Sequence, residues 1–194
     1  MENNTFAKHP TFYAIGLSYK KADAEMRGKF SLDDKSKANL LLQAKEEGIE
    51  NLIVTSTCNR TEIYGFAQHP FQLIKLLCEN SQGTVEDFQK VAFVYKNHEA
   101  ISHMFRVGTG LDSQILGDSE IISQLKNAFI QSKEFGLANS FLERLVNSVI
   151  QASKKIKTDT DISSGATSVS FSAVRYIFNN VADISNKNIL LFGT

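Results

Sequence analysis

Two short apolar segments, separated by only a few turn residues, constrain the fold of this chain more than any other feature. They are NLIVTST (51–57) and TEIYGFA (61–67), and the turn between them contains Cys58 and Asn59. Short runs of β-branched and aromatic residues flanking a tight connection predict two consecutive strands. Because the connection is so short, the two strands must be antiparallel neighbours in one sheet.

Further strand and helix patterns lie on both sides of this pair. Residues 11–18 predict a strand, and a helix beginning at Asp33 or Asp34 and ending at Gly48 follows it. A second helix begins at Pro70, and VAFVY (91–95) predicts a fourth strand. The order β-α-β-β-α-β predicts an α+β fold with a ferredoxin-like antiparallel sheet.

The pattern becomes helical after Lys96, which predicts a sheet part at 1–96 and a helical part at 97–160. The first helix runs through Leu111 into the connection GTGLDSQILGD, and the next ends near Gly136. Ser140 and Glu143 form a capping-box pair for a third helix.

The last part of the chain predicts a change of domain. DTDISSGAT (159–167) is a polar break, a helix of about 169–181 follows, and ILLFG is an apolar run ending in Gly193. Such a run is typical of a buried parallel strand that precedes a phosphate-binding loop. Residues 161–194 therefore predict a linker with the opening helix and first strand of a Rossmann-type domain. We expect the sequence to be cut through a larger protein.

Composition narrows the classes of function. Lys plus Arg and Asp plus Glu are equal at 21 each, which argues against a protein that binds nucleic acid over a broad basic surface. The sequence shows no membrane-spanning run and no signal peptide, so we expect a cytoplasmic protein. Cys58 and Cys78 lack metal-ligand spacing, so neither a zinc site nor any other metal is expected.

Cys58 is the candidate nucleophile. Backbone N–H groups of a turn and the charge of Arg60 both favour thiolate, the reactive form of cysteine. A small buried core residue is the alternative reading of Cys58, and it is the preferred one for Cys78, which follows Leu76 and Leu77 on an apolar helix.

Other polar residues also allow two readings. Arg60 could bind a carboxylate through its planar fork or form a surface ion pair with Glu62. His103 lies among apolar residues and could be a core residue or a catalyst. The polar stretch 111–120 could line a pocket, or Asp112 or Asp118 could cap a helix.

Several blocks together resemble one family, the glutamyl-tRNA reductases. They are GLSYKKADAEMR, STCNRTEIY, SHMFRVGTGLDSQILGDSEIISQLKNAF and the closing ILLFG, which span nearly the whole chain. The family usually has LGE-x-Q where this chain has Gly117-Asp118-Ser119-Glu120, so one carboxylate is shorter and one amide is replaced by a carboxylate.

The resemblance implies a specific reaction. Cys58 attacks the ester of glutamyl-tRNA, a thioester forms, and NADPH then reduces it to glutamate-1-semialdehyde, the first step of five-carbon tetrapyrrole synthesis. His103 falls on a histidine important for activity, and Gly193 and Thr194 fall on the start of the NADP phosphate loop. The implied substrate-binding residues are Thr57, Asn59, Arg60, Ser113, Asp118, Ser119, Glu120 and Gln124.

The resemblance also implies partners and limits. The full-length protein is expected to be a homodimer that hands its product to glutamate-1-semialdehyde aminomutase. The 194-residue chain is expected to lack reductase activity but to form the thioester and hydrolyse it slowly. The alternative is a non-catalytic RNA-binding or regulatory module, although VAFVY lacks the basic-aromatic pattern of an RNA-binding strand.

Overall fold

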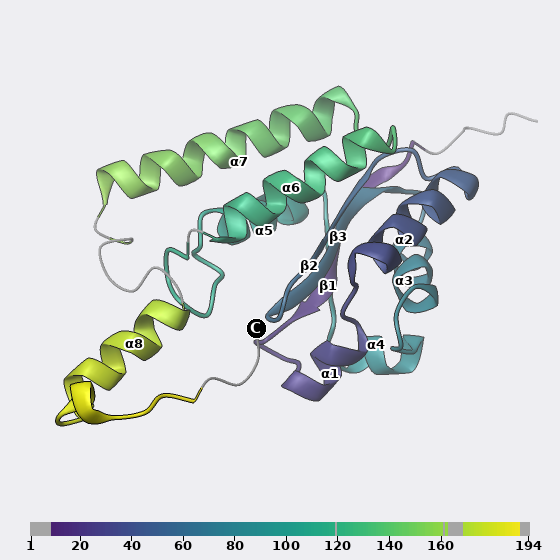
Figure 1. Ribbon diagram of the computed structural model, residues 1–194. Coiled ribbons are helices and arrows are strands. Elements are labelled where there is room, and N and C mark those ends of the chain that lie inside the picture. Colours follow the sequence, from purple (N-terminus) through teal and green to yellow (C-terminus); the bar gives the residue numbers. More distant parts are fainter. Residues whose placement is uncertain (1–8, 119, 161, 163–168, 191–194) are drawn as a thin grey trace, which may run out of the picture.

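The two predicted strands form a hairpin at one edge of a four-stranded sheet in the computed structural model (Figure 1). They are β2 (Leu52–Ser56) and β3 (Arg60–Ala67), and the sheet order is β2-β3-β1-β4 with β1 at Thr11–Ser18 and β4 at Phe93–Lys96. Every neighbouring pair is antiparallel. The predicted antiparallel sheet is confirmed over the residues that the structure describes, which are 9–118, 120–160, 162 and 169–190.

Helices connect the strands on one face of the sheet. The helices α1 (Ala24–Lys29) and α2 (Asp34–Glu46) join β1 to β2, and α3 (Pro70–Glu79) and α4 (Val85–Val91) join β3 to β4. The fourth strand therefore begins two residues later than predicted, since Val91 ends α4. The Thr84 side chain caps α4 by accepting a hydrogen bond from Asp87 N, and Phe88 anchors the helix in the core.

Alternate strand residues build a separate core on each face. Ile15, Leu17 and Ile63 pack with the apolar side of α2 and α3. Ala14 and Tyr64 face the opposite way, into a second core. That second core is covered by α5 (His98–Gly108), α6 (Glu120–Glu134) and α7 (Ser140–Asp159). Figure 1 shows the two groups of helices on opposite sides of the sheet. The period of two in a strand thus decides which residues face which helices.

Two helix boundaries and one whole helix differ from the prediction. The first is that α5 ends at Gly108, and Leu111 lies beyond it with 45% of its surface exposed. Gly110 has φ of 76°, a left-handed conformation that ends the helical path. The second is that Asn139, not Ser140, caps α7, because its side chain accepts a hydrogen bond from Leu142 N. The third is α1, which the sequence reading did not predict.

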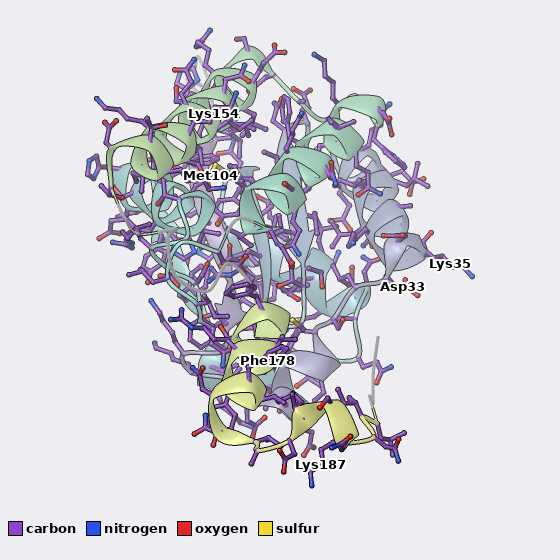
Figure 2. The ribbon with its side chains drawn as sticks, turned by 60° about the vertical axis from the view of Figure 1, so that its left-hand side comes forward. Asp33, Lys35, Met104, Lys154, Phe178 and Lys187 are labelled. Atoms are coloured by element: carbon purple, nitrogen blue, oxygen red, sulfur yellow. The ribbon has the colours of Figure 1, made fainter. Side chains whose placement is uncertain are left out.

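The end of the chain was predicted correctly only in part. The helix α8 (Val169–Asn180) is present, and Figure 2 shows Phe178 on it, well apart from Met104 in the core beneath α5 and α7. Ile189 and Leu190 were expected in a buried strand, but they have no strand hydrogen bonds and are 71% and 78% exposed. A parallel strand is buried only between neighbouring strands and helices, and the described strands give these residues no neighbour. The rest of that segment, 191–194, lies outside the described residues.

Gly16 is the position where the sheet has least room. It pairs with Glu62, and a Cβ added there would lie 2.4 Å from Thr61 O and 2.9 Å from Glu62 Cα. We expect Gly16→Ala to lower the free energy of unfolding by about 2 kcal/mol, because β1 and β3 must separate. Chemical denaturation measures the change.

Gly28 provides the matched control. It lies in α1, and an added Cβ would meet nothing within 4 Å. Gly28→Ala should leave stability unchanged or raise it by up to about 1 kcal/mol. Equal effects of the two substitutions would contradict the close approach at Gly16.

Candidate functional site

Cys58 lies exposed at the tip of the β2–β3 hairpin. The turn is closed by a hydrogen bond from Thr57 N to Arg60 O (2.8 Å), and Thr57 Oγ1 accepts the amides of Asn59 and Arg60, each at 3.2 Å. A threonine hydroxyl that accepts amides ahead of it stabilises a tight turn. The local sequence therefore fixes the backbone and leaves the thiol outside.

Two hydrogen bonds join this turn to the segment after β1. Arg27 Nε donates to Cys58 O at 2.9 Å, and Tyr19 N donates to Asn59 O at 2.9 Å. Arg27 also donates to Ala22 O at 2.7 Å. The backbone of the cysteine turn is thus held by the segment after β1, which restricts its motion.

Arg60 begins β3 and points away from the thiol turn into a buried network. It is 2% exposed and donates through Nη1 to Glu62 Oε1 at 2.9 Å. Its Nη2 donates to the carbonyl oxygen of Asp112 and lies 3.3 Å from Asp112 Oδ1. Lys20 Nζ binds the other carboxylate oxygen of Asp112 at 2.7 Å. The ion pair with Glu62 that the sequence allowed is present, but it is buried rather than at the surface.

Glu62 is the centre of this network. Its carboxylate is fully buried; Oε1 also lies 3.1 Å from His103 Nε2, and Oε2 accepts the hydroxyl of Tyr64 at 2.5 Å. Burial acts to raise the pKa of Glu62, but the hydrogen bond with His103 and the charge of Arg60 outweigh burial and lower that pKa. An ionised carboxylate only accepts hydrogen bonds, so Nε2 of His103 carries the hydrogen between them.

The neighbours of Glu62 respond to its charge. Burial and the negative charge of Glu62 raise the pKa of Tyr64 well above 10.0, so the phenol stays protonated and donates. Burial acts to lower the pKa of Arg60, but Glu62, Tyr64 and Asp112 raise it overall. The network is therefore a chain of charge-assisted hydrogen bonds.

His103 is surrounded by aromatic rings on the other side of Glu62. Its ring centroid is 4.6 Å from Phe93, 5.1 Å from Tyr95 and 6.1 Å from Tyr64. Among the described residues, its Nδ1 has no hydrogen-bond partner although it is buried. His103 is thus a core residue by position, with one nitrogen left to meet another group.

The loop between α5 and α6 was expected to supply several substrate-binding residues. Ser113 and Asp118 are half-buried and Glu120 is exposed. Asp118 Oδ1 accepts the amide of Glu120 at 2.9 Å, so Asp118 caps the start of α6. Ser119 lies outside the described residues, as do Gly193 and Thr194.

A cleft of ≈ 610 Å³ opens beside Cys58, between β2, α2 and α6. It is lined by Asp34, Lys37, Val54, Thr55, Ser56, Thr57, Cys58, Gln124, Asn127, Ala128 and Gln131. Three of the predicted site residues, Thr57, Cys58 and Gln124, therefore share one cavity. Arg60 and His103 share the buried network instead, and Asn59 belongs to the turn.

The sequence reading missed most of this network. Glu62 was considered only as a surface ion-pair partner of Arg60, and no role was predicted for Tyr64. The alternation Arg60, Glu62, Tyr64 on one strand could have revealed their common face. No local pattern pairs Lys20 with Asp112, which are 92 positions apart.

The comparisons with known proteins agree on one family. Residues 15–160 match the family model described as "Glutamyl-tRNAGlu reductase, N-terminal domain". The chain belongs to the glutamyl-tRNA reductase family. It is 82% identical over 194 residues to a glutamyl-tRNA reductase of Flavobacterium psychrophilum and 70% identical to one of Christiangramia forsetii.

These relatives are longer than the chain. All of this chain aligns with them, but it covers 47% and 46% of their lengths, so it spans about half of each. The solved glutamyl-tRNA reductase of Methanopyrus kandleri has the same fold, with a TM-score of 0.70 at 24% identity over 87% of this chain and 39% of that one. Within the part that the structure describes, no helix is long and apolar enough to cross a bilayer, and no cluster of three metal-ligating side chains occurs.

The two cysteines should differ in reactivity. Cys58 is exposed, whereas Cys78 packs against the core, as expected, and burial followed by the charges of Glu86 and Glu79 raises its pKa. We expect iodoacetamide to alkylate Cys58 much faster than Cys78 in the folded protein, because the thiolate is the reactive form. Peptide mapping over time measures both rates. The difference should disappear in urea, and equal rates in the folded protein would contradict the site geometry.

Glu62→Gln should destabilise the fold by about 3 kcal/mol, because it removes one of the two buried counter-charges of Arg60 and leaves only Asp112. The folded pKa of Glu62 is lowered, so its contribution is complete above the ordinary value of 4.5 and is lost as pH falls through the folded value. The stability difference between wild type and variant should therefore shrink below that pH. Denaturation at several pH values measures it.

Glu134→Gln, on the exposed side of α6, is the control and should change stability little at any pH. Parallel pH curves for wild type and Glu62→Gln would mean that folding leaves the pKa of Glu62 unchanged, which would contradict its lowered value.

Proposed function

We propose that this chain accepts the glutamyl group of glutamyl-tRNA on Cys58, as the acyl-transfer part of a glutamyl-tRNA reductase. The observation that carries the proposal is an exposed cysteine on a fixed turn, opening into a cleft, in a chain that matches the family over 15–160. The relatives are about twice as long. The activity of the whole protein is therefore part of the proposal.

The covalent step needs a fixed sulfur and a displaced alcohol. The Cys58 thiolate attacks the ester carbonyl, an S–C bond forms, and the C–O bond to the tRNA breaks. The leaving alkoxide takes up the proton that the thiol gave up, so the step balances. Arg27, Tyr19 and Thr57 hold the backbone of the turn, and a fixed nucleophile lowers the entropic part of the barrier.

We assign Arg60 to the side-chain carboxylate of the substrate, since its planar fork suits a carboxylate. In this structure it is buried beneath Asp112, which already accepts from Nη2. The proposal therefore requires the segment around Asp112 to shift when substrate binds. Lys20, which holds the second oxygen of Asp112, is the residue that would keep this carboxylate away from Arg60 in the shifted state.

His103 and the remaining residues complete the assignment. Nδ1 of His103 is the buried nitrogen free to meet a substrate group once the segment moves. Gln124 reaches the cleft from α6, and Thr57 and Asn59 shape the turn. We assign Ser113, Asp118, Ser119 and Glu120 to the amino-acid end of the substrate, on the resemblance in sequence alone.

The NADPH site is expected outside the described residues. Gly193 and Thr194, which were expected to begin its site, lie outside those residues, so we derive no step through the cofactor here. For the whole protein we propose NADPH-dependent reduction to glutamate-1-semialdehyde, the first step of tetrapyrrole synthesis. A homodimer, a cytoplasmic location and transfer of the product to the aminomutase belong to the same proposal.

Intact-mass measurement after mixing the chain with glutamyl-tRNA tests the acyl transfer. We expect a gain of one glutamyl group, labile to hydroxylamine as a thioester is, which then decays to free glutamate because water takes the place of a reductant. Cys58→Ser should form no thioester while still binding tRNA, and Cys78→Ser should behave as wild type. A thioester on Cys78 would refute the assignment of Cys58. No thioester on the folded wild type would refute the acyl transfer and favour a non-catalytic RNA-binding module.

A further inference from the structure

The acyl-transfer step requires room for two groups at Cys58. The glutamyl group lies on one side of the ester carbonyl, and the terminal nucleoside of the tRNA lies on the other. Arg60 and His103, assigned to the amino acid, lie inward of the hairpin in the buried network. The cleft between α2 and α6 begins at the same cysteine and extends the other way, along the outer edge of β2.

The floor of this cleft is an unpaired strand edge. Thr57 and Arg60 form a hydrogen-bonded pair. In an antiparallel pair only every second residue of a strand bonds to its neighbour, so Thr55 and Ile53 are the β2 residues whose backbone groups bond to β3. The backbone groups of Val54 and Ser56 consequently point outwards into the cleft. Leu52 also points outwards, but its N–H is taken by Leu137 O at 3.0 Å, which closes the edge below the cleft.

The walls are polar, and one of them carries an ion pair. Gln124, Asn127 and Gln131 lie along α6, and the seven positions they span correspond to roughly 10 Å of helix. Lys37 faces the cleft from α2 with 20% of its side chain exposed, and its Nζ lies 3.2 Å from a carboxylate oxygen of Asp34, which is 97% exposed. The cleft is longer than a glutamyl group needs, and its donors and acceptors suit a base and a phosphate.

We propose that this groove, formed by β2, α2 and α6, binds the terminal adenosine of the tRNA, with Asn127 and Gln131 on the base and Lys37 near a backbone phosphate. The inference rests on the proposed acyl transfer. Amide side chains pair well with adenine, which presents one donor and one acceptor side by side. The strand edge offers the same pair of groups from its backbone at Val54 and Ser56.

Three acyl donors separate the nucleoside from the amino acid. They are glutamyl-tRNA, glutamyl-adenosine esterified on the ribose, and a glutamate α-ethyl thioester that has no nucleoside. The rate of Cys58 acylation is measured for each by mass spectrometry of quenched samples. We expect Asn127→Ala and Gln131→Ala to lower the rate of acylation by the two adenosine donors roughly 5- to 100-fold relative to the rate with the small thioester. Asn147→Ala, an exposed amide on α7, is the matched control and should leave the ratios unchanged.

Lys37→Ala should act only on the phosphate. For glutamyl-tRNA, it should lower the slope of log acylation rate against log salt concentration by about 0.7, the value for one phosphate contact to a single strand. The rate of acylation by glutamyl-adenosine should not change. Lys35→Ala is the charge-matched control, since Lys35 is on the same helix but points into solvent (Figure 2). Asp34→Asn should raise the rate at which glutamyl-tRNA acylates Cys58, because it removes the carboxylate that competes with the phosphate for Lys37.

Several results would overturn the proposal. An equal loss with all three donors would show that the groove residues support Cys58 or the amino-acid site instead. Unchanged ratios in the variants would leave the strand edge to another occupant, such as an extended peptide that pairs with β2. A wild type that reacts with the small thioester but with neither adenosine donor would also exclude the groove. If wild type reacts with no donor, the acyl transfer itself fails and this inference with it.

Discussion

The site depends on one buried carboxylate. Glu62 accepts hydrogen bonds from Arg60, His103 and Tyr64 with none of its surface exposed. A buried charge is costly unless it is paired and fully hydrogen-bonded. Satisfying Glu62 therefore fixes three side chains from two elements, and Arg60 in turn fixes Asp112 in the loop before α6. Gly16 contributes to the burial of Glu62, because its lack of a side chain lets β1 lie close against this residue.

This arrangement gives the hairpin two opposite chemical surroundings. Inward of the turn, the strand residues join a buried and charged network. At the tip, Cys58 stays exposed, while Thr57, Arg27 and Tyr19 hold its backbone. Outward, the free edge of β2 borders a polar cleft. Under the proposed acyl transfer, Cys58 lies between Arg60, which is assigned to the small half of the substrate, and the groove, which is assigned to the large half.

Local sequence was sufficient for the sheet and for the position of the thiol. The short link between two apolar runs predicted the hairpin and placed Cys58 in its turn. Val91 was assigned to the wrong element because its β-branched side chain favours a strand, whereas the Thr84 cap and Phe88 packing extend a helix over it. Contacts distant in sequence could not be predicted. Lys20 meets Asp112 and α6 meets β2 only because the whole chain folds, so the cleft and the burial of Arg60 were not foreseen.

The central claim is that Glu62 is a carboxylate inside the folded protein and not a neutral acid. Carbon-13 NMR of the glutamate side-chain carboxyl groups, with Glu62 assigned by comparison with Glu62→Gln, follows its ionisation directly during a pH titration. We expect the chemical shift of a carboxylate at neutral pH and a titration midpoint below the ordinary value of 4.5. A midpoint above that value, or a neutral acid at pH 7, would mean that burial outweighs Arg60 and His103, and the proposed organisation of the site would be wrong.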